Sequence, residues 1–223
     1  MGQNEHTRWW QADGIGYIVI DNPPMNVLSP LNRQGMLAAL TEFRDAKARA
    51  VVITGAGDRA FCGGADLKEE EKLTDANVQQ FLERGQELNW TIRDYDAPII
   101  GAINGWAMGG GLVLALWCDL RLGSTRAKMG AVGVKVGLMA SNIQLTRFLN
   151  EARARDLLLT GRTVEAEEAL RLGLLSKVVS PDALLDEATA WAKAIAARPP
   201  AEIAQAKRAI NGARDGGWVE VPA

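Results

Sequence analysis

The stretch between Ala97 and Cys118 constrains the fold most, because it carries no charged residue over a length that would cross a membrane. A membrane-spanning helix needs about 20 apolar residues in succession. This stretch is interrupted by Pro98 and by three glycines at positions 109–111, which favour turns over one continuous helix. We therefore interpret PIIGAI as a short buried strand and LVLALW as a short buried helix in the core of a soluble protein.

Strand-like and helix-like segments alternate through the first 140 residues. The predicted strands are GYIVID (16–21), AVVITG (50–55), the segment near Ile99 and residues 119–122. One helix is predicted from Ser29-Pro30, where a hydroxyl N-cap precedes a proline at the first helical position, and another from Thr74 to about Arg93. This alternation is typical of an α/β fold with a mostly parallel sheet.

The chain after about Ser141 is predicted to be helical. One short helix begins at Thr163 and ends at Gly173, because glycine readily adopts the conformation that terminates a helix. A second helix begins at Ser180-Pro181, and a third occupies residues 201–211.

Charge and cysteine content exclude several classes of function. The net charge is -2 and basic residues form no stripe, so neither a nucleic acid nor a membrane is an expected partner. Cys62 and Cys118 have neither a metal-ligand spacing nor a disulfide framework, which favours a reducing, cytoplasmic setting without a bound metal. The only histidine, His6, lies in a polar leader that does not resemble a secretory signal, so histidine-dependent mechanisms have little support.

Gly55 and Gly57 follow a predicted strand and imitate the start of a dinucleotide-binding motif. That motif must open directly into a helix, whereas this one runs into Phe61-Cys62-Gly63-Gly64. We interpret the segment as a turn at the end of a strand.

Two other glycine runs indicate an anion-binding site made of backbone. Gly63 and Gly64 lie within AFCGGADLKE, and Gly109 to Gly111 precede the short apolar helix, whose first amides lack intrahelical partners. Each run alone is more often an ordinary turn. If one amide from each run points at the same atom, the pair forms an oxyanion hole, where one donor is worth roughly 10² to 10³ in rate.

Four segments together resemble the crotonase superfamily, the enoyl-CoA hydratase/isomerase family. They are DNPPMNVLS (21–29), VVITGAGDRAFCGGADLKE (51–69), APIIGAINGWAMGGGLVLALWCDLRLGS (97–124) and LLLTGRTVEAEEALRLGLLSKVVS (157–180). The resemblance implies an α/β fold with a crotonase-like spiral of ββα units over residues 1–140. A helical trimerisation region over 141–223 would follow, apparently shortened at its C-terminus. It further implies an acyl-CoA thioester as the ligand, no separate cofactor, and a homotrimer or hexamer.

The same resemblance assigns roles to individual residues. The catalytic oxyanion donors would be the backbone amides of Ala65 and Gly110. The residues expected to contact coenzyme A are Asn26, Val27, Leu28, Ala65, Asp66, Leu67 and Lys68. Lys68 is equally well explained as a solvated lysine in a charged run.

The chain departs from the family at its acid–base positions. The hydratases of the family carry two glutamates, and these positions fall on Val113 and Gly133. A third position, an aspartate in some relatives, falls near Ser141, and no Asp or Glu occurs between Asp119 and Glu151. The sequence therefore predicts a lyase or isomerase of this family that stabilises a thioester enolate, with little support for hydration itself. The alternative is a catalytically impaired acyl-CoA-binding protein.

Several other side chains have a structural and a functional interpretation. Asp66 is expected to cap the next turn, Asp119 to be hydrogen-bonded scaffold and Cys62 to be a small buried residue. Lys135 is expected to be exposed, although an apolar setting would make it a candidate base. The candidates for the acyl pocket, equally explained by core packing, are Trp106, Met129 and Met139.

Overall fold

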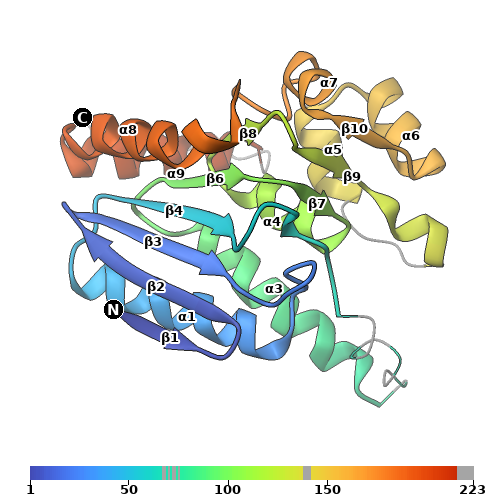
Figure 1. Ribbon diagram of the computed structural model, residues 1–223, viewed down its shortest axis with the longest axis horizontal. Coiled ribbons are helices and arrows are strands. Elements are labelled where there is room, and N and C mark those ends of the chain that lie inside the picture. Colours follow the sequence, from blue (N-terminus) through green and yellow to red (C-terminus); the bar gives the residue numbers. More distant parts are fainter. Residues whose placement is uncertain (67–68, 70, 72–73, 75, 138–141, 215–223) are drawn as a thin grey trace.

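The computed structural model describes residues 1–66, 69, 71, 74, 76–137 and 142–214, and a seven-stranded sheet forms its centre (Figure 1). Its strands, in spatial order, are β1 (Gly2–Asn4), β2 (Thr7–Ala12), β3 (Ile15–Ile20), β4 (Ala50–Gly55), β6 (Ile99–Ile103), β8 (Leu120–Ser124) and β11 (Lys177–Val179). The first three strands pair antiparallel, and every pairing from β3 to β11 is parallel.

A second, four-stranded sheet lies at one end of the first. Its order is β10 (Thr163–Glu165), β9 (Lys128–Gly130), β7 (Trp106–Met108) and β5 (Ala60–Cys62), with only β10 antiparallel to its neighbour. A strand of the large sheet is followed by a strand of the small one three times, as β4–β5, β6–β7 and β8–β9, and each pair then leads into helical structure. This repetition is the spiral of ββα units that the sequence predicts.

Helices cover both faces of the large sheet (Figure 1). On one face lie α1 (Pro30–Asp45), α3 (Val78–Arg93) and α4 (Gly110–Trp117), which bury the larger apolar cluster. On the other lies α8 (Leu184–Ala196), whose Leu184, Ala188 and Ala192 pack on β3, β4, β6 and β8. The helix α9 (Pro200–Arg214) contacts α3, because Lys207 donates to the Ile92 carbonyl and Asn211 to the Arg93 carbonyl. With apolar cover on both sides, β3 is buried at every residue, as central strands of such sheets are.

The predicted helical region after about Ser141 is present, but two short strands interrupt it. Helical elements do dominate there, namely α5 (Asn142–Phe148), α6 (Glu151–Thr160), α7 (Ala166–Arg171) and the 3-10 turn η2 (Pro181–Ala183), preceded by the 3-10 turn η1 (Val132–Val136). However, β10 and β11 also come from this region, and each supplies the outermost strand of one sheet. Both sheets therefore extend across residue 140, the predicted boundary between core and helical region.

Two helix starts that the sequence predicts can be compared with the structure. The start at Ser29-Pro30 is confirmed, because the Ser29 side chain accepts from the Asn32 amide and Asn32 returns a hydrogen bond to the Ser29 amide. The start at Thr74 is wrong, because α3 begins at Val78 after Asn77, whose side chain accepts from the Thr74 amide. The polar leader also forms β1 and β2, which the sequence did not indicate.

Candidate active site

The Ala65 amide is aimed by the hydrogen bond that its own peptide group makes on the opposite side. The Gly64 carbonyl, which belongs to the Gly64–Ala65 peptide, accepts from the Leu28 amide at 2.7 Å, and Leu28 and Ala65 form an isolated parallel bridge. Because the C=O and N–H of a trans peptide point in opposite directions, the Ala65 N–H is turned away from Leu28. Gly64 has φ +106°, a conformation that an L side chain rarely adopts.

The Gly110 amide is aimed in the same way by the start of α4. The Gly109 carbonyl accepts from the Val113 amide at 3.1 Å, so the N–H of the same peptide, that of Gly110, points out of the N-terminal end of the helix. Gly109 is the N-cap, with φ 50°, and its amide donates to the Gly130 carbonyl at 2.9 Å. Both donor peptides are thus held by hydrogen bonds to their neighbours.

The two donor peptides lie against each other. A methyl group built on Gly110 would be 3.4 Å from the Ala65 nitrogen, and one built on Gly64 would be 3.3 Å from the Gly110 nitrogen and 2.7 Å from the Met108 carbonyl oxygen. Within the described part of the chain, neither the Ala65 amide nor the Gly110 amide has a protein acceptor. Two backbone donors without a protein acceptor in this part of the chain therefore lie close together.

The predicted coenzyme A contacts are placed next to this pair but differ in exposure. The side chain of Asn26 is buried: its Nδ2 donates to the carbonyls of Ala56 and Ala60 at 3.0 and 2.7 Å. It has φ 53°, a left-handed conformation that asparagine tolerates. Val27, Leu28 and Asp66 are half-buried in the loops that meet at the bridge. Leu67 and Lys68 lie outside the described residues.

The positions that would carry acid–base carboxylates are placed only in part. Val113 is half-buried on α4 and lies three residues after Gly110, so both lie on the same side of the helix. Gly133 lies in η1, which follows β9, the neighbour of β7 in the small sheet. Ser141 lies outside the described residues.

Most of the other candidates are scaffold. Asp119 Oδ2 accepts from the Ile99 amide at 2.7 Å and from Lys207 Nζ at 2.8 Å, which confirms it as hydrogen-bonded scaffold. Desolvation raises the pKa of Asp119 above its ordinary value, against the opposing influence of Lys207. Cys62 is fully buried, and burial raises the pKa of its thiol to about 12, so it is the inert small residue expected. Lys135 is exposed.

The two described candidates for the acyl pocket differ in exposure. Met129 is 1% exposed and belongs to the core, whereas Trp106 is 43% exposed and lies beside Lys128 in a hollow of about 420 Å³ on the small sheet. Met139 lies outside the described residues. The Asp66 carbonyl accepts from the Glu69 amide at 2.9 Å.

Two site-supporting residues were missed by sequence reasoning. Asn104 accepts from the Gly55 amide at 3.2 Å and donates to the Gly55, Gly57 and Ala60 carbonyls, so it ties the turn after β4 to the end of β6. Arg33, on α1, binds the Leu28 carbonyl and the Glu69 carboxylate. Asn104 interrupts an apolar run, which is a weak signal, whereas Arg33 lies in the polar run Asn32-Arg33-Gln34 and gives none.

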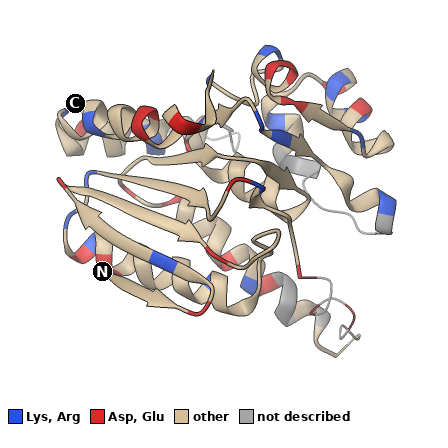
Figure 2. Ribbon diagram, viewed as in Figure 1, with Lys and Arg blue, Asp and Glu red and all other residues tan. Residues whose placement is uncertain are grey.

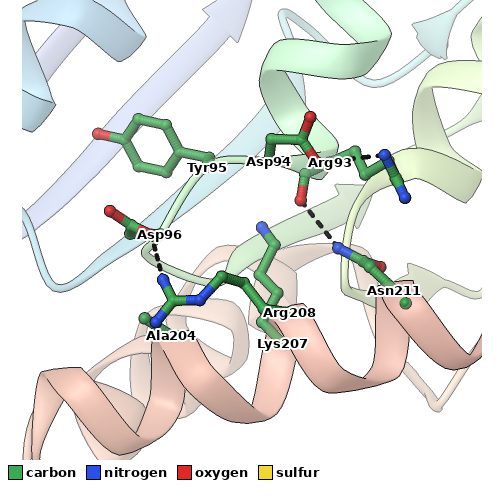
Figure 3. A pocket seen from close by; sticks show the side chains of 9 residues that line it. Arg93, Asp94, Tyr95, Asp96, Ala204, Lys207, Arg208 and Asn211 are labelled. Carbon is green, nitrogen blue, oxygen red and sulfur yellow. Dashed lines mark hydrogen bonds and ion pairs between the residues drawn. The ribbon is translucent and has the colours of Figure 1, made fainter. Parts of the chain in front are cut away.

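A second hollow, of about 260 Å³, lies between α9 and the connection from α3 to β6 (Figure 3). Its polar groups are used in contacts between these elements, since Arg208 pairs with Asp96 at 2.9 Å and Asn211 donates to the Arg93 carbonyl at 2.9 Å (Figure 3). These contacts join α9 to the core, and the hollow is separate from the Ala65 and Gly110 amides.

Charge and metal-ligand chemistry add no competing site in the described residues. Basic and acidic residues are interspersed over helices, strands and loops (Figure 2). Among the residues that the structure places, no group of three His, Cys, Asp or Glu side chains gathers to hold a metal ion. Nor is any described helix both long and apolar enough to cross a membrane.

Comparisons with known proteins agree with this fold. The family model for enoyl-CoA hydratase/isomerase matches residues 11–216. The (E)-benzylidenesuccinyl-CoA hydratase of Thauera aromatica is 40% identical over 203 residues, which cover 89% of this chain and 79% of the relative. The short-chain-enoyl-CoA hydratase of Clostridium acetobutylicum is 31% identical over 202 residues, covering 88% and 77%.

Solved structures give the same result. DspI of Pseudomonas aeruginosa has a TM-score of 0.91 at 31% identity, covering 96% of this chain and 84% of its own. The enoyl-CoA hydratase of Bacillus anthracis has a TM-score of 0.87 at 32% identity, covering 92% and 82%. The chain belongs to the enoyl-CoA hydratase/isomerase family, within the crotonase superfamily, and is an acyl-CoA enzyme of that family.

Proposed function

We propose that this enzyme stabilises the enolate of an acyl-CoA thioester, with the backbone amides of Ala65 and Gly110 as the catalytic donors. The observation that carries the proposal is the placement of these two amides. Each belongs to a peptide whose carbonyl is held by a neighbour, and a methyl on Gly110 would be 3.4 Å from the Ala65 nitrogen. Donors fixed before the reaction need no reorganisation when charge develops on the thioester oxygen.

The chemistry is a proton transfer at the carbon next to the thioester. When a base removes an α-hydrogen, the electron pair of the C–H bond moves into the C–C bond and the carbonyl π pair moves onto oxygen. The oxygen then carries a negative charge, and the Ala65 and Gly110 N–H groups donate to it. Each donor contributes roughly 10² to 10³ in rate because the site replaces water with fixed dipoles.

The acid–base partner determines which enolate reaction follows. Neither α4 nor η1 contains an Asp or Glu. The family resemblance places the two hydratase glutamates at Val113, on α4, and Gly133, in η1. Ser141, the third such position, is also not a carboxylic acid. Two of the relatives named above are called hydratases, whereas the residues at the positions that the family resemblance gives to the hydratase acids are Val113 and Gly133 in this chain. We therefore favour a double-bond shift, a decarboxylation or a carbon–carbon cleavage over hydration.

The ligand is held by the loops around the Leu28–Ala65 bridge. The residues half-buried there are Val27, Leu28 and Asp66. Asn26 holds its loop in place through the hydrogen bonds from its side chain to the Ala56 and Ala60 carbonyls. Leu67 and Lys68 complete the proposed coenzyme A contacts. Coenzyme A enters as part of the substrate, so the proposal includes no separate cofactor and no metal.

A second candidate is an acyl-CoA-binding protein with little turnover. The same missing carboxylates favour it, because an oxyanion hole without a proton-transfer group binds a thioester but leaves its hydrogens in place.

One set of measurements separates the two candidates. Crotonyl-CoA and butyryl-CoA are incubated with the protein in heavy water, and hydration and α-hydrogen exchange are followed by NMR and mass spectrometry. Exchange without hydration is the expected result. Hydration faster than exchange contradicts the argument from Val113 and Gly133, binding with neither reaction supports the second candidate, and no binding of either thioester rejects both.

A further inference from the structure

Arg33 is a buried cation on the wall of the candidate active site. It is the fourth residue of α1, and its side chain is 8% exposed. Its Nη1 donates to the Leu28 carbonyl at 2.9 Å, and its Nη2 lies 2.7 and 2.6 Å from the two carboxylate oxygens of Glu69. Burying a guanidinium is costly unless its donors find acceptors, and here the Leu28 carbonyl and the Glu69 carboxylate accept from it.

The start of α1 does not need this side chain. The helix is capped by Ser29 and Asn32, which satisfy each other's amides in a capping box. The Arg33 amide donates to the Ser29 carbonyl at 3.1 Å, as any residue at that position would. The guanidinium instead contacts groups outside the helix, namely the Leu28 carbonyl and the Glu69 carboxylate.

The contacts with Leu28 and Glu69 both lead to the Ala65 amide. Leu28 uses its N–H to hold the Gly64 carbonyl at 2.7 Å, and that bond sets the plane of the Gly64–Ala65 peptide. Arg33 holds the carbonyl of the same Leu28, so it fixes the residue that aims the donor. On the other side of Ala65, the Asp66 carbonyl accepts from the Glu69 amide at 2.9 Å, and Arg33 binds the carboxylate of the same Glu69.

We propose that Arg33 is a positioning residue, which fixes the Ala65 amide by holding Leu28 before it and Glu69 after it in one closed ring of contacts. The proposal rests on the proposed function, because it assigns a cause to the direction of one of the two donors. Arginine suits this place because its planar fork holds two partners at once, which a lysine ammonium does not match in geometry.

The test compares Arg33→Met with Arg33→Lys and with a matched control, Arg121→Met. Arg121 is also buried and donates to the backbone carbonyls of Leu174 and Cys118 at 2.7 and 2.8 Å. Cys118 follows the C-terminal end of α4, whereas Gly110 lies at its N-terminal end. Loss of Arg121 reports the general cost of removing a buried guanidinium. The measurements are α-hydrogen exchange of butyryl-CoA and the carbonyl stretching frequency of bound, ¹³C-labelled acyl-CoA by difference infrared spectroscopy.

In Arg33→Met we expect kcat for exchange to fall about tenfold, less than removal of a whole donor would cause, with KM changed by no more than about twofold. The downshift of the bound carbonyl frequency, which reports hydrogen bonding to the thioester oxygen, should shrink in parallel. Arg33→Lys keeps the charge near Glu69 without the fork, so it should retain the fold and show the same losses. Arg121→Met should lower the denaturant midpoint and leave kcat and the frequency unchanged.

The possible failures are distinguishable. If the unmodified protein neither exchanges nor shifts the carbonyl frequency, the proposed function fails, whatever Arg33 does. If the unmodified protein shows both effects and folded Arg33→Met or Arg33→Lys keeps them in full, the positioning role is refuted. Equal losses in Arg121→Met would refute it as well, because they would show a general softening of the fold.

Discussion

The ion pair between Lys207 and Asp119 offers the sharpest test of how the C-terminal helix is held. Lys207 Nζ lies 2.8 Å from Asp119 Oδ2 and 3.1 Å from the Ile92 carbonyl, with 6% of its side chain exposed (Figure 3 shows Lys207 reaching from α9). One cation therefore connects α9 to the end of α3 and to the start of β8. The substitution Lys207→Met keeps the apolar stem and leaves the carboxylate without its counter-charge.

The expected loss follows from the burial of both partners. Removing one member of a buried pair costs about 3–5 kcal/mol, because a charge stays behind without compensation. The Asp119 side chain keeps 23% of its surface exposed, so the lower limit applies, about 3 kcal/mol at neutral pH. For a chain of this size, that corresponds to a fall of roughly 6–12 °C in Tm.

The loss should also depend on pH, with a definite sign. Desolvation raises the pKa of Asp119 above 3.8, so its ionised form is unfavourable in the fold and its contribution to stability decreases as pH rises through the folded-state pKa. Lys207 opposes that rise, so its removal increases the pKa further. The destabilisation by Lys207→Met should therefore be largest at neutral pH and shrink as pH falls toward 3.8, where Asp119 becomes neutral in both states.

Urea unfolding followed by far-ultraviolet circular dichroism, at several pH values, measures this. Arg208→Met is the matched control on the same helix, because its pair with Asp96 is 60% and 76% exposed and should be worth less than about 1 kcal/mol. Asp119→Asn combined with Lys207→Met should recover most of the loss. If Lys207→Met costs no more than Arg208→Met at neutral pH, or costs more in acid, the reasoning is wrong.

Three further predictions concern activity and assembly. Gly110→Pro removes the donor N–H at a helix position that accepts proline, so exchange should fall about 10² to 10³-fold in heavy water, whereas Gly110→Ala, with its methyl 3.4 Å from the Ala65 nitrogen, should retain most of it. Val113→Glu with Gly133→Glu should raise crotonyl-CoA hydration measured by loss of enoyl absorbance, and no gain in a folded double variant counts against these positions. Light scattering should give three or six times the 24.0 kDa chain mass, and a monomer would refute the proposed homotrimer or hexamer.

Segments whose structure is decided locally were predictable from the sequence. The Ser29-Pro30 helix start depends on side chains within four residues, and AVVITG and PIIGAI are apolar runs long enough to be recognised as strands. The strands that were missed, such as β10 and β11, have three residues each and exist because distant strands accept them. Their residues carry no periodic pattern that local reasoning would detect.

The glycines of the candidate site were predictable, but their supports were not. Gly63-Gly64 and Gly109 to Gly111 stand out because backbone that turns tightly needs glycine. Arg33 and Asn104 do not stand out, since a polar residue in a helix or at a strand end is usually solvated. Only the packed fold shows that these two side chains hold carbonyl groups of neighbouring segments.

The direction of each donor N–H is a property of a peptide plane, and the residue that sets it lies elsewhere in the chain. Ala65 is aimed because Leu28, 37 positions earlier, holds the Gly64 carbonyl, and Gly110 is aimed because Val113 holds the Gly109 carbonyl. Both holding groups are backbone amides, so the hydrogen bond that aims Gly110 does not depend on the side chain of Val113. A change at position 113, where the family resemblance places a hydratase glutamate, can therefore leave the amide pair intact, so under the proposed function one scaffold could keep enolate stabilisation and alter the reaction that follows.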